Sequence, residues 1–290
     1  MNSAGQDLYP RSIDEISTWR AEHRTTLDEA RRRLAQIVIL RRIARTTDVS
    51  RMLAFKGGNA LRLCHHSPRT TVDLDFSALG LPDDLNVVAA SISRALSEST
   101  VEPNLRCKVH SAHRNPPGPD KTTPTYLVNI SYSFPGDRHY SAFFEPATRS
   151  LRFIPVDVSI NDVVCEVCDV FLEDDEEHSL SVCVPEDIMA EKLRAILQQR
   201  PRNRQRPQDV YDIARHLRVY GSAVDRAKVR SYLYRKSEAR GIAATSEAFD
   251  AEIRARARRR TTERWHLILG RSSSRSMMHG PRLSRSSRQS

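Results

Sequence analysis

The chain has 290 residues, of which 28% are charged and 39% are hydrophobic, a composition typical of globular proteins. No apolar run approaches the roughly 18 residues that cross a bilayer, and the N-terminus lacks the pattern of a signal peptide. We therefore expect a cytoplasmic protein with no membrane partner. The net charge of +10 lies entirely in residues 254–290, which hold 11 arginines and one acid, so it does not by itself indicate a nucleic-acid site in the core.

The five cysteines are an odd number spread over a long chain, which argues against a disulfide scaffold. Cys165 and Cys168 form a C-x-x-C, but no second pair lies at zinc-finger spacing. We expect most cysteines to be buried thiols, with a zinc or redox role as the less favoured alternative.

The N-terminal third is predicted to begin with a packing helix over residues 12–45, which Ser12 and Glu15 would cap in a capping box. Another amphipathic helix follows after Asp83 or Asp84, either of which suits the N-cap position. The proline-rich residues 113–124 are predicted to form a loop.

Between these helices, residues 55–76 carry the strongest candidate site. Gly57 and Gly58 precede a short predicted helix from Asn59, and Asp73 and Asp75 then alternate with apolar residues. Residues two apart on a strand face the same way, so both carboxylates would share a face and could hold a divalent cation. The glycines would let a phosphate approach the backbone, although a diglycine alone is more often an ordinary turn.

Strictly alternating segments predict strands at 126–134 and 151–160, and Asp157 is the lone carboxylate on the polar side of the second. VCDVFLE and SLSVCV predict two more strands around an acidic turn, EDDEEH, which we interpret as a solvated loop. Helices follow from Pro185 and from Pro207, joined by a loop with four arginines. That loop has two open interpretations, RNA contact or solvation, and its arginines are Arg200, Arg202, Arg204 and Arg206.

Four ordered motifs, KGGNAL, RTTVDLDF, PEDIMAEKLRAI and RPQDVYDIARH, resemble those of the AbiEii/AbiGii nucleotidyltransferase toxins. That family belongs to the DNA polymerase beta nucleotidyltransferase superfamily and includes the MenT-type toxins that modify tRNA. The resemblance covers roughly residues 35–220 and implies an α+β fold, a mixed nucleotidyltransferase sheet with flanking helices and a helical C-terminal region.

The resemblance also implies roles for individual residues. Asp73 and Asp75 match the ligands of one or two Mg²⁺ ions, and Asp157 fits the third acid of the superfamily. Lys192 matches a lysine that contacts the nucleotide phosphates, and Asp209 matches the acid of the last motif. Nucleotide binding would also involve Lys56, Gly57, Gly58, Asn59, Arg69 and Thr71.

Two departures from the family pattern bear on nucleotide affinity. Asn59 replaces the usual hydroxyl residue after the glycines, and Gln208 stands where a basic residue often precedes the last motif's acid. Both leave the expected chemistry unchanged.

We expect four parts: an N-terminal helical segment (1–45), a nucleotidyltransferase core (46–184), a helical region (185–256) and a disordered basic tail (257–290). The leading hypothesis is a toxin that transfers NMP from an NTP to the 3′ end of tRNA and inhibits translation, with a cognate antitoxin as partner. The alternatives are transfer to a protein or to an aminoglycoside-like hydroxyl, or a non-catalytic RNA-binding or regulatory protein.

Overall fold

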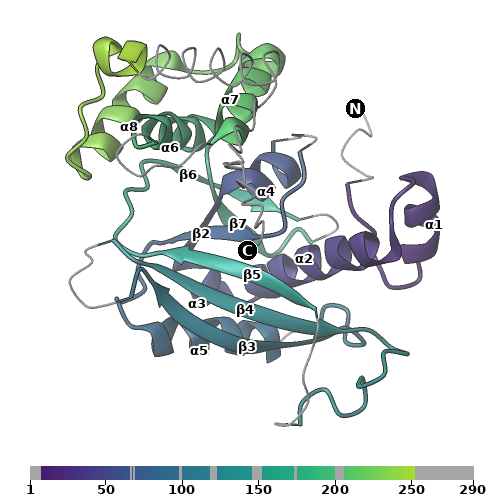
Figure 1. Cartoon of the computed structure of the whole chain (residues 1–290). Helices are drawn as coiled ribbons and strands as arrows, with labels where there is room; N and C mark the ends of the chain where they lie inside the picture. The colour runs from purple at the N-terminus through teal and green to yellow at the C-terminus, as the bar shows by residue number, and fades with distance from the viewer. Residues whose placement is uncertain are drawn as a thin grey trace, which may run out of the picture. The chain divides into compact units, whose positions relative to one another are not determined.

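The sheet of this protein brings together strands from both halves of the sequence (Figure 1). The computed structural model describes residues 8–65, 67, 69–97, 100–117, 123–145, 152–172, 175–199 and 206–251. Chain contacts divide the protein into two compact units, Met1–Ala244 and Thr245–Ser290, and all elements below lie in the first. The predicted tail and Arg200, Arg202 and Arg204 lie outside the described residues.

Seven strands form one mixed sheet in the order β3-β4-β5-β2-β1-β7-β6. The β2–β5 and β1–β7 pairs are parallel, and the other neighbours are antiparallel. This sheet and its helices confirm the expected α+β class. The strands are β1 (Leu53–Lys56), β2 (Leu74–Ala78), β3 (Arg106–Asn115), β4 (Thr125–Ser133), β5 (Phe153–Ser159), β6 (Val167–Phe171) and β7 (Ser179–Cys183).

Apolar alternation in the sequence placed the central strands correctly. The predicted inner faces of β4 and β5 are buried, and β6 and β7 form the expected antiparallel pair. The predicted loop was wrong at its start, because β3 continues through residues 113–115, paired with β4. Among the described residues, β3 is an edge strand of the sheet, a position where polar residues are common.

Three helices, α2 (Leu27–Arg45), α3 (Thr47–Arg51) and α5 (Leu85–Ser97), pack together beside the sheet. Their apolar residues join the inner faces of the strands in one hydrophobic core. Asp84 caps α5, because its Oδ1 accepts from the backbone N–H groups of Asn86 and Val87. One of the two predicted caps is therefore confirmed, and Asp83 instead binds Arg114.

The predicted single helix over residues 12–45 was wrong, because the chain breaks between α1 (Ile16–Glu22) and α2. Arg24 has a φ of 49°, which no helix accommodates. Thr26 caps the second helix, with its Oγ1 accepting from Glu29 N at 3.1 Å. The predicted Ser12–Glu15 cap is absent, and the Glu15 carboxylate accepts from the backbone of Arg11.

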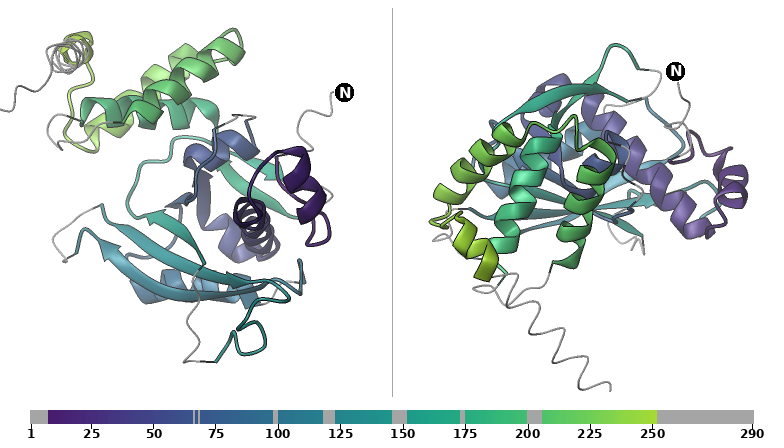
Figure 2. Two further views of the ribbon diagram at one scale, coloured as in Figure 1. Left: turned by 45° about the vertical axis from the view of Figure 1, so that its right-hand side comes forward. Right: turned by 90° about the horizontal axis from the view of Figure 1, so that it is seen from above.

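The remaining helices are α4 (Gly57–Leu63), α6 (Pro185–Leu197), α7 (Pro207–Tyr220) and α8 (Arg226–Glu238). The starts of α6 and α7 at prolines are as predicted. Figure 2 shows α6, α7 and α8 grouped together, and α6 packs against both of the others. Within the described residues, no helix is long and apolar enough to span a membrane.

Candidate active site

Three carboxylates meet where β2 and β5 run side by side. Asp75 and Asp157 occupy the same register position of this parallel pair, and Asp73 lies just before β2. One oxygen from each of the three residues lies within 4.8 Å of the others. The structure therefore brings together the three acids that the sequence predicted as metal ligands.

The electrostatics of this cluster suit a cation. Burial and the neighbouring Asp73 raise the pKa of Asp75 to about 7, and the same two causes raise the pKa of Asp157 to about 6. Asp157 Oδ1 is buried and has no hydrogen-bond partner. Carboxylate oxygens are the ligands that Mg²⁺ prefers, so these three residues fit a divalent ion that would offset their repulsion.

Mg²⁺ is expected to raise the melting temperature more at about pH 8 than at about pH 5.5, because protons compete with the ion. Asp75 and Asp157 have native-state pKa values above the ordinary value of about 3.9, so between about pH 4 and 7 the native state binds more protons than the unfolded state. Without metal, stability contributed by this cluster falls as pH rises through that window. Melting temperatures measured with and without Mg²⁺ between about pH 4 and 8 test both expectations. The same Mg²⁺-induced increase at about pH 5.5 and at about pH 8 would contradict the competition between protons and the ion.

The two glycines make room for side chains of the site. Gly57 begins α4 with a φ of 75°, and a Cβ there would lie 2.2 Å from Asp75 Oδ2. A Cβ on Gly58 would lie 2.6 Å from both the Arg69 guanidinium and Thr71 Cγ2. The sequence explained these glycines by the approach of a phosphate; the structure adds that each also accommodates a predicted site residue.

Gly57→Ala is expected to lower both stability and metal affinity. The substitution adds a methyl group where Asp75 now lies and imposes a left-handed backbone on alanine, which costs on the order of 1–3 kcal/mol. Chemical unfolding and Mn²⁺ titration measure the two effects. Gly80→Ala is the matched control, because its nearest neighbour would be Met52 Cγ at 3.8 Å. Equal behaviour of the two variants would contradict this account of Gly57.

The Asn59 side chain forms hydrogen bonds within the chain. This side chain is 1% exposed, and Nδ2 donates to the carbonyl oxygens of Thr71, at 3.3 Å, and Asp73, at 2.6 Å. Gln36 Nε2 donates to the same segment, at the carbonyl oxygens of Thr71 and Val72. Asn59 therefore positions the backbone that carries the first carboxylate.

A second polar cluster joins α6, α7 and the segment before β2. Lys192 Nζ donates to Asp209 Oδ1 at 3.1 Å and to Asp212 Oδ2 at 2.8 Å. Arg69 binds the same Asp212 with two hydrogen bonds, of 2.8 and 2.9 Å. Lys192 and Asp209 thus lie together as their motifs implied. Asp212 was missed, although it follows Asp209 by three residues and so shares its helix face.

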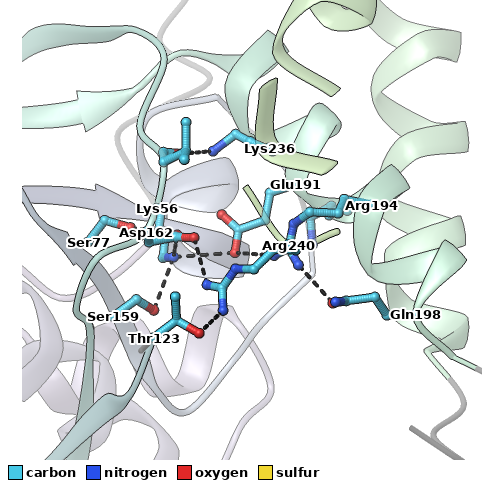
Figure 3. Close-up of polar contacts among 12 residues, drawn as sticks. Lys56, Ser77, Thr123, Ser159, Asp162, Glu191, Arg194, Gln198, Lys236 and Arg240 are labelled. Atoms are coloured by element: carbon cyan, nitrogen blue, oxygen red, sulfur yellow. Dashed lines mark hydrogen bonds and ion pairs between the residues drawn. The ribbon is translucent and has the colours of Figure 1, made fainter. Parts of the chain in front are cut away.

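Lys56, the last residue of β1, lies in a buried polar network (Figure 3). Its Nζ donates to Asp162 at 2.7 Å, to Ser159 at 3.2 Å and to Glu191 at 3.3 Å. Burial lowers the pKa of Lys56, but Glu191 and Asp162 outweigh it and raise the pKa above its ordinary value. Lys56 pairs with Asp75 across β1 and β2, so a permanent positive charge lies beside the carboxylates.

The same network connects the sheet to the C-terminal helices. Arg240, just after α8, donates to Asp162 at 3.2 Å and also to Thr123 (Figure 3). Glu191 and Lys192 are neighbours on α6, one binding Lys56 and the other the aspartates of α7. Sequence reasoning missed Asp162, Glu191 and Arg240, because their partners lie far away in the chain.

A cavity of about 310 Å³ lies at the meeting point of these groups, within the size range of small-ligand sites. Most predicted site residues line it; Asn59 and Asp157 do not. Its lining is Lys56, Gly57, Gly58, Arg69, Thr71, Asp73, Asp75, Ile188, Glu191, Lys192, Ala195, Arg206, Gln208 and Asp209. Its lining includes both carboxylates and cations, the two charge types that a metal-bound phosphate ester requires.

Several solved structures are similar to part of this chain. JHP933 from Helicobacter pylori is 17% identical, with 69% of this chain and 72% of that chain covered and a TM-score of 0.42. MenT4, a nucleotidyltransferase toxin from Mycobacterium tuberculosis H37Rv, is 19% identical, with 71% and 63% covered and a TM-score of 0.43. Structural similarity with identities and TM-scores this low assigns no functional role to any residue of this chain. No curated protein sequence gives a significant match.

The sequence profile of one family matches residues 38–276, which is most of the chain. That family is described as the nucleotidyl transferase AbiEii toxin of type IV toxin–antitoxin systems. Its activity implies a nucleoside triphosphate as substrate, and its toxin–antitoxin class implies an antitoxin as partner. The chain belongs to the AbiEii family of nucleotidyltransferase toxins.

Proposed function

We propose that this toxin transfers NMP from a nucleoside triphosphate to the 3′ end of tRNA, with Mg²⁺ held by Asp73, Asp75 and Asp157. The observation that carries the proposal is the cluster of these carboxylates, with ligand atoms within 4.8 Å, at the edge of a cavity lined by Lys192 and Arg69. Family membership supplies the reaction class. The tRNA acceptor rests on the resemblance of the four motifs to those of the tRNA-modifying members.

The triphosphate would lie between the carboxylates and the cations. Gly57 and Gly58 line the cavity and leave backbone accessible to a phosphate. Lys192 is 8% exposed, and its two aspartate partners fix the direction of its ammonium group. A cation held in this way needs little reorganisation when the substrate binds. Such a preorganised charge stabilises the transition state more than it strengthens substrate binding.

The reaction forms a bond between an acceptor hydroxyl oxygen and the α-phosphorus, and breaks the bond to the β-phosphate oxygen. Pyrophosphate leaves with its electron pair, and the hydroxyl proton passes to solvent. Mg²⁺, when bound, would lower the pKa of the acceptor hydroxyl and neutralise charge on the phosphate oxygens. Asp73, Asp75 and Asp157 would hold the ion, with Asp157 supplied by β5, next to β2.

Blocking the 3′ end of tRNA would prevent aminoacylation and thereby inhibit translation. Both tRNA and nucleoside triphosphates are abundant in the cytoplasm, which is where we place the protein. The cognate antitoxin would relieve the inhibition.

The test is incubation of the protein with Mg²⁺ and each α-labelled NTP in turn, with total tRNA, a mixture of cellular proteins, or an aminoglycoside as acceptor. Label in tRNA at its 3′ end is the expected result. Label in protein or in the aminoglycoside, with none in RNA, would overturn the tRNA assignment while retaining the reaction class. Binding of Mg²⁺·NTP without transfer to any acceptor would overturn the catalytic proposal.

A further inference from the structure

In the described part of the chain, no helix packs extensively on the face of β3, β4 and β5 that carries Asp157, and residues 140–143 contact that face only at its Arg106 end. The helices that pack extensively on β3, β4 and β5 in the described part of the chain are α5 and α2, both on the side of the buried residues (Figure 1). The opposite face carries the alternate residues of each strand. Asp157 belongs to that face, followed across the sheet by Leu127 and then His113.

The charge of this face favours an anionic partner. Asp157 is the only acidic residue in β3, β4 and β5, whereas β3 contributes Arg106, Lys108, His110 and His113 to the open face. Arg106 donates to the carbonyls of Tyr140 and Ser141, and Lys108 to that of Phe143. These acceptors are neutral, so both cations retain their net charge.

The same face carries two aromatic side chains, His110 and Phe153, at a fixed distance from the proposed metal site. His110 lies at a register shift of β3, and its ring centroid is 4.7 Å from that of Phe153 on β5. Phe153 precedes Asp157 by four residues, which on a strand corresponds to about 13 Å. That span accommodates about four stacked nucleotides, since stacked bases of one strand are spaced by about 3.4 Å.

We propose that the open face of β3, β4 and β5 binds the single-stranded 3′ end of the acceptor RNA, leading its terminal hydroxyl to the metal site. This inference rests on the function proposed above. Arg106 and Lys108 would attract the phosphates, and the His110–Phe153 pair would stack against a base. Polar sheet faces with exposed rings bind unpaired RNA in this way, because every base has a π-face and no base pairing obstructs it.

The primary test introduces one negative charge midway along β3, on the proposed RNA-binding face. Ser111 is exposed on β3 between His110 and His113, so Ser111→Glu should weaken binding of an RNA hairpin with an unpaired 3′ tail by about tenfold at low salt, with a smaller effect at high salt. Ser93→Glu is the matched control, because Ser93 is exposed on α5, on the other side of the sheet. The control should stay within about twofold of wild type, and both variants should bind Mg²⁺·NTP normally.

A second pair of variants tests stacking. His110 is exposed, so its replacement should not disturb the core. His110→Ala should weaken RNA binding by about fivefold or more, and His110→Tyr should retain wild-type affinity, since it keeps a ring.

The outcomes separate this inference from the proposed function. Suppose that the wild-type protein labels RNA, and that Ser111→Glu binds and labels RNA as well as Ser93→Glu does. The proposed RNA-binding face is then refuted, and the proposed transfer to tRNA is retained. If both glutamate variants weaken RNA binding equally, the proposed RNA-binding face is also refuted, because the effect then reflects the net charge of the protein alone. If wild type labels a protein acceptor and no RNA, both proposals are overturned.

Discussion

Asp73→Asn is expected to lower the rate of label transfer from an α-labelled NTP by about 1,000-fold or more, equal to about 4 kcal/mol of transition-state stabilisation. Asparagine keeps the shape of the side chain but removes one charge from the set that would hold the metal. The remaining acids, Asp75 and Asp157, would bind Mg²⁺ more weakly and place it less accurately.

The same substitution is not expected to destabilise the fold. Asp73 raises the pKa of Asp75 and of Asp157 through like-charge repulsion, so its removal should leave the metal-free melting temperature unchanged or increase it. Asp169→Asn is the matched control, since Asp169 is exposed on β6 and lies outside the cavity lining. Retained transfer activity in Asp73→Asn, measured at saturating Mg²⁺, would contradict the role given to this carboxylate.

Lys192→Met is expected to cost about 3 kcal/mol of unfolding free energy, because it leaves carboxylates of Asp209 and Asp212 in a buried place without their shared cation. Arg69 continues to neutralise Asp212, so most of the loss in unfolding free energy would come from the carboxylate of Asp209. Transfer activity should also fall by about 100-fold or more, since one cation facing the cavity is lost.

A double variant separates the two effects. Lys192→Met combined with Asp209→Asn removes the uncompensated charge, so stability should largely return while activity stays low. Urea unfolding and the transfer assay, each on both variants, provide the comparison. Wild-type stability in the single variant, or recovered activity in the double variant, would refute the account of Lys192.

Most residues of the candidate site were placed near one another correctly by the sequence because they follow local rules. The D-x-D spacing placed two carboxylates together at the start of β2, and the alternation in β5 left Asp157 close to both. Prolines and first-turn acids located α6 and α7, which carry Lys192 and Asp209. In each case, the periodicity of the element determines the direction of the side chain.

What the sequence did not predict depends on contacts through space. The pairing of Arg69 with Asp212 joins residues 143 positions apart, and no local pattern predicts it. The hydrogen bond from the buried amide of Asn59 to the backbone of Asp73 was likewise not predicted. The break at Arg24 was missed because the apparent cap at Ser12 was joined to the apolar spacing that begins only at Leu27.

The most direct measurement of the central claim compares two positions of the label in the same NTP. The wild-type protein with Mg²⁺ and acceptor RNA should incorporate label from the α-phosphate and none from the γ-phosphate, which should appear in pyrophosphate. Asp73→Asn should incorporate neither. Incorporation of the γ-label into the acceptor would show phosphoryl transfer instead of nucleotidyl transfer, and would contradict the account.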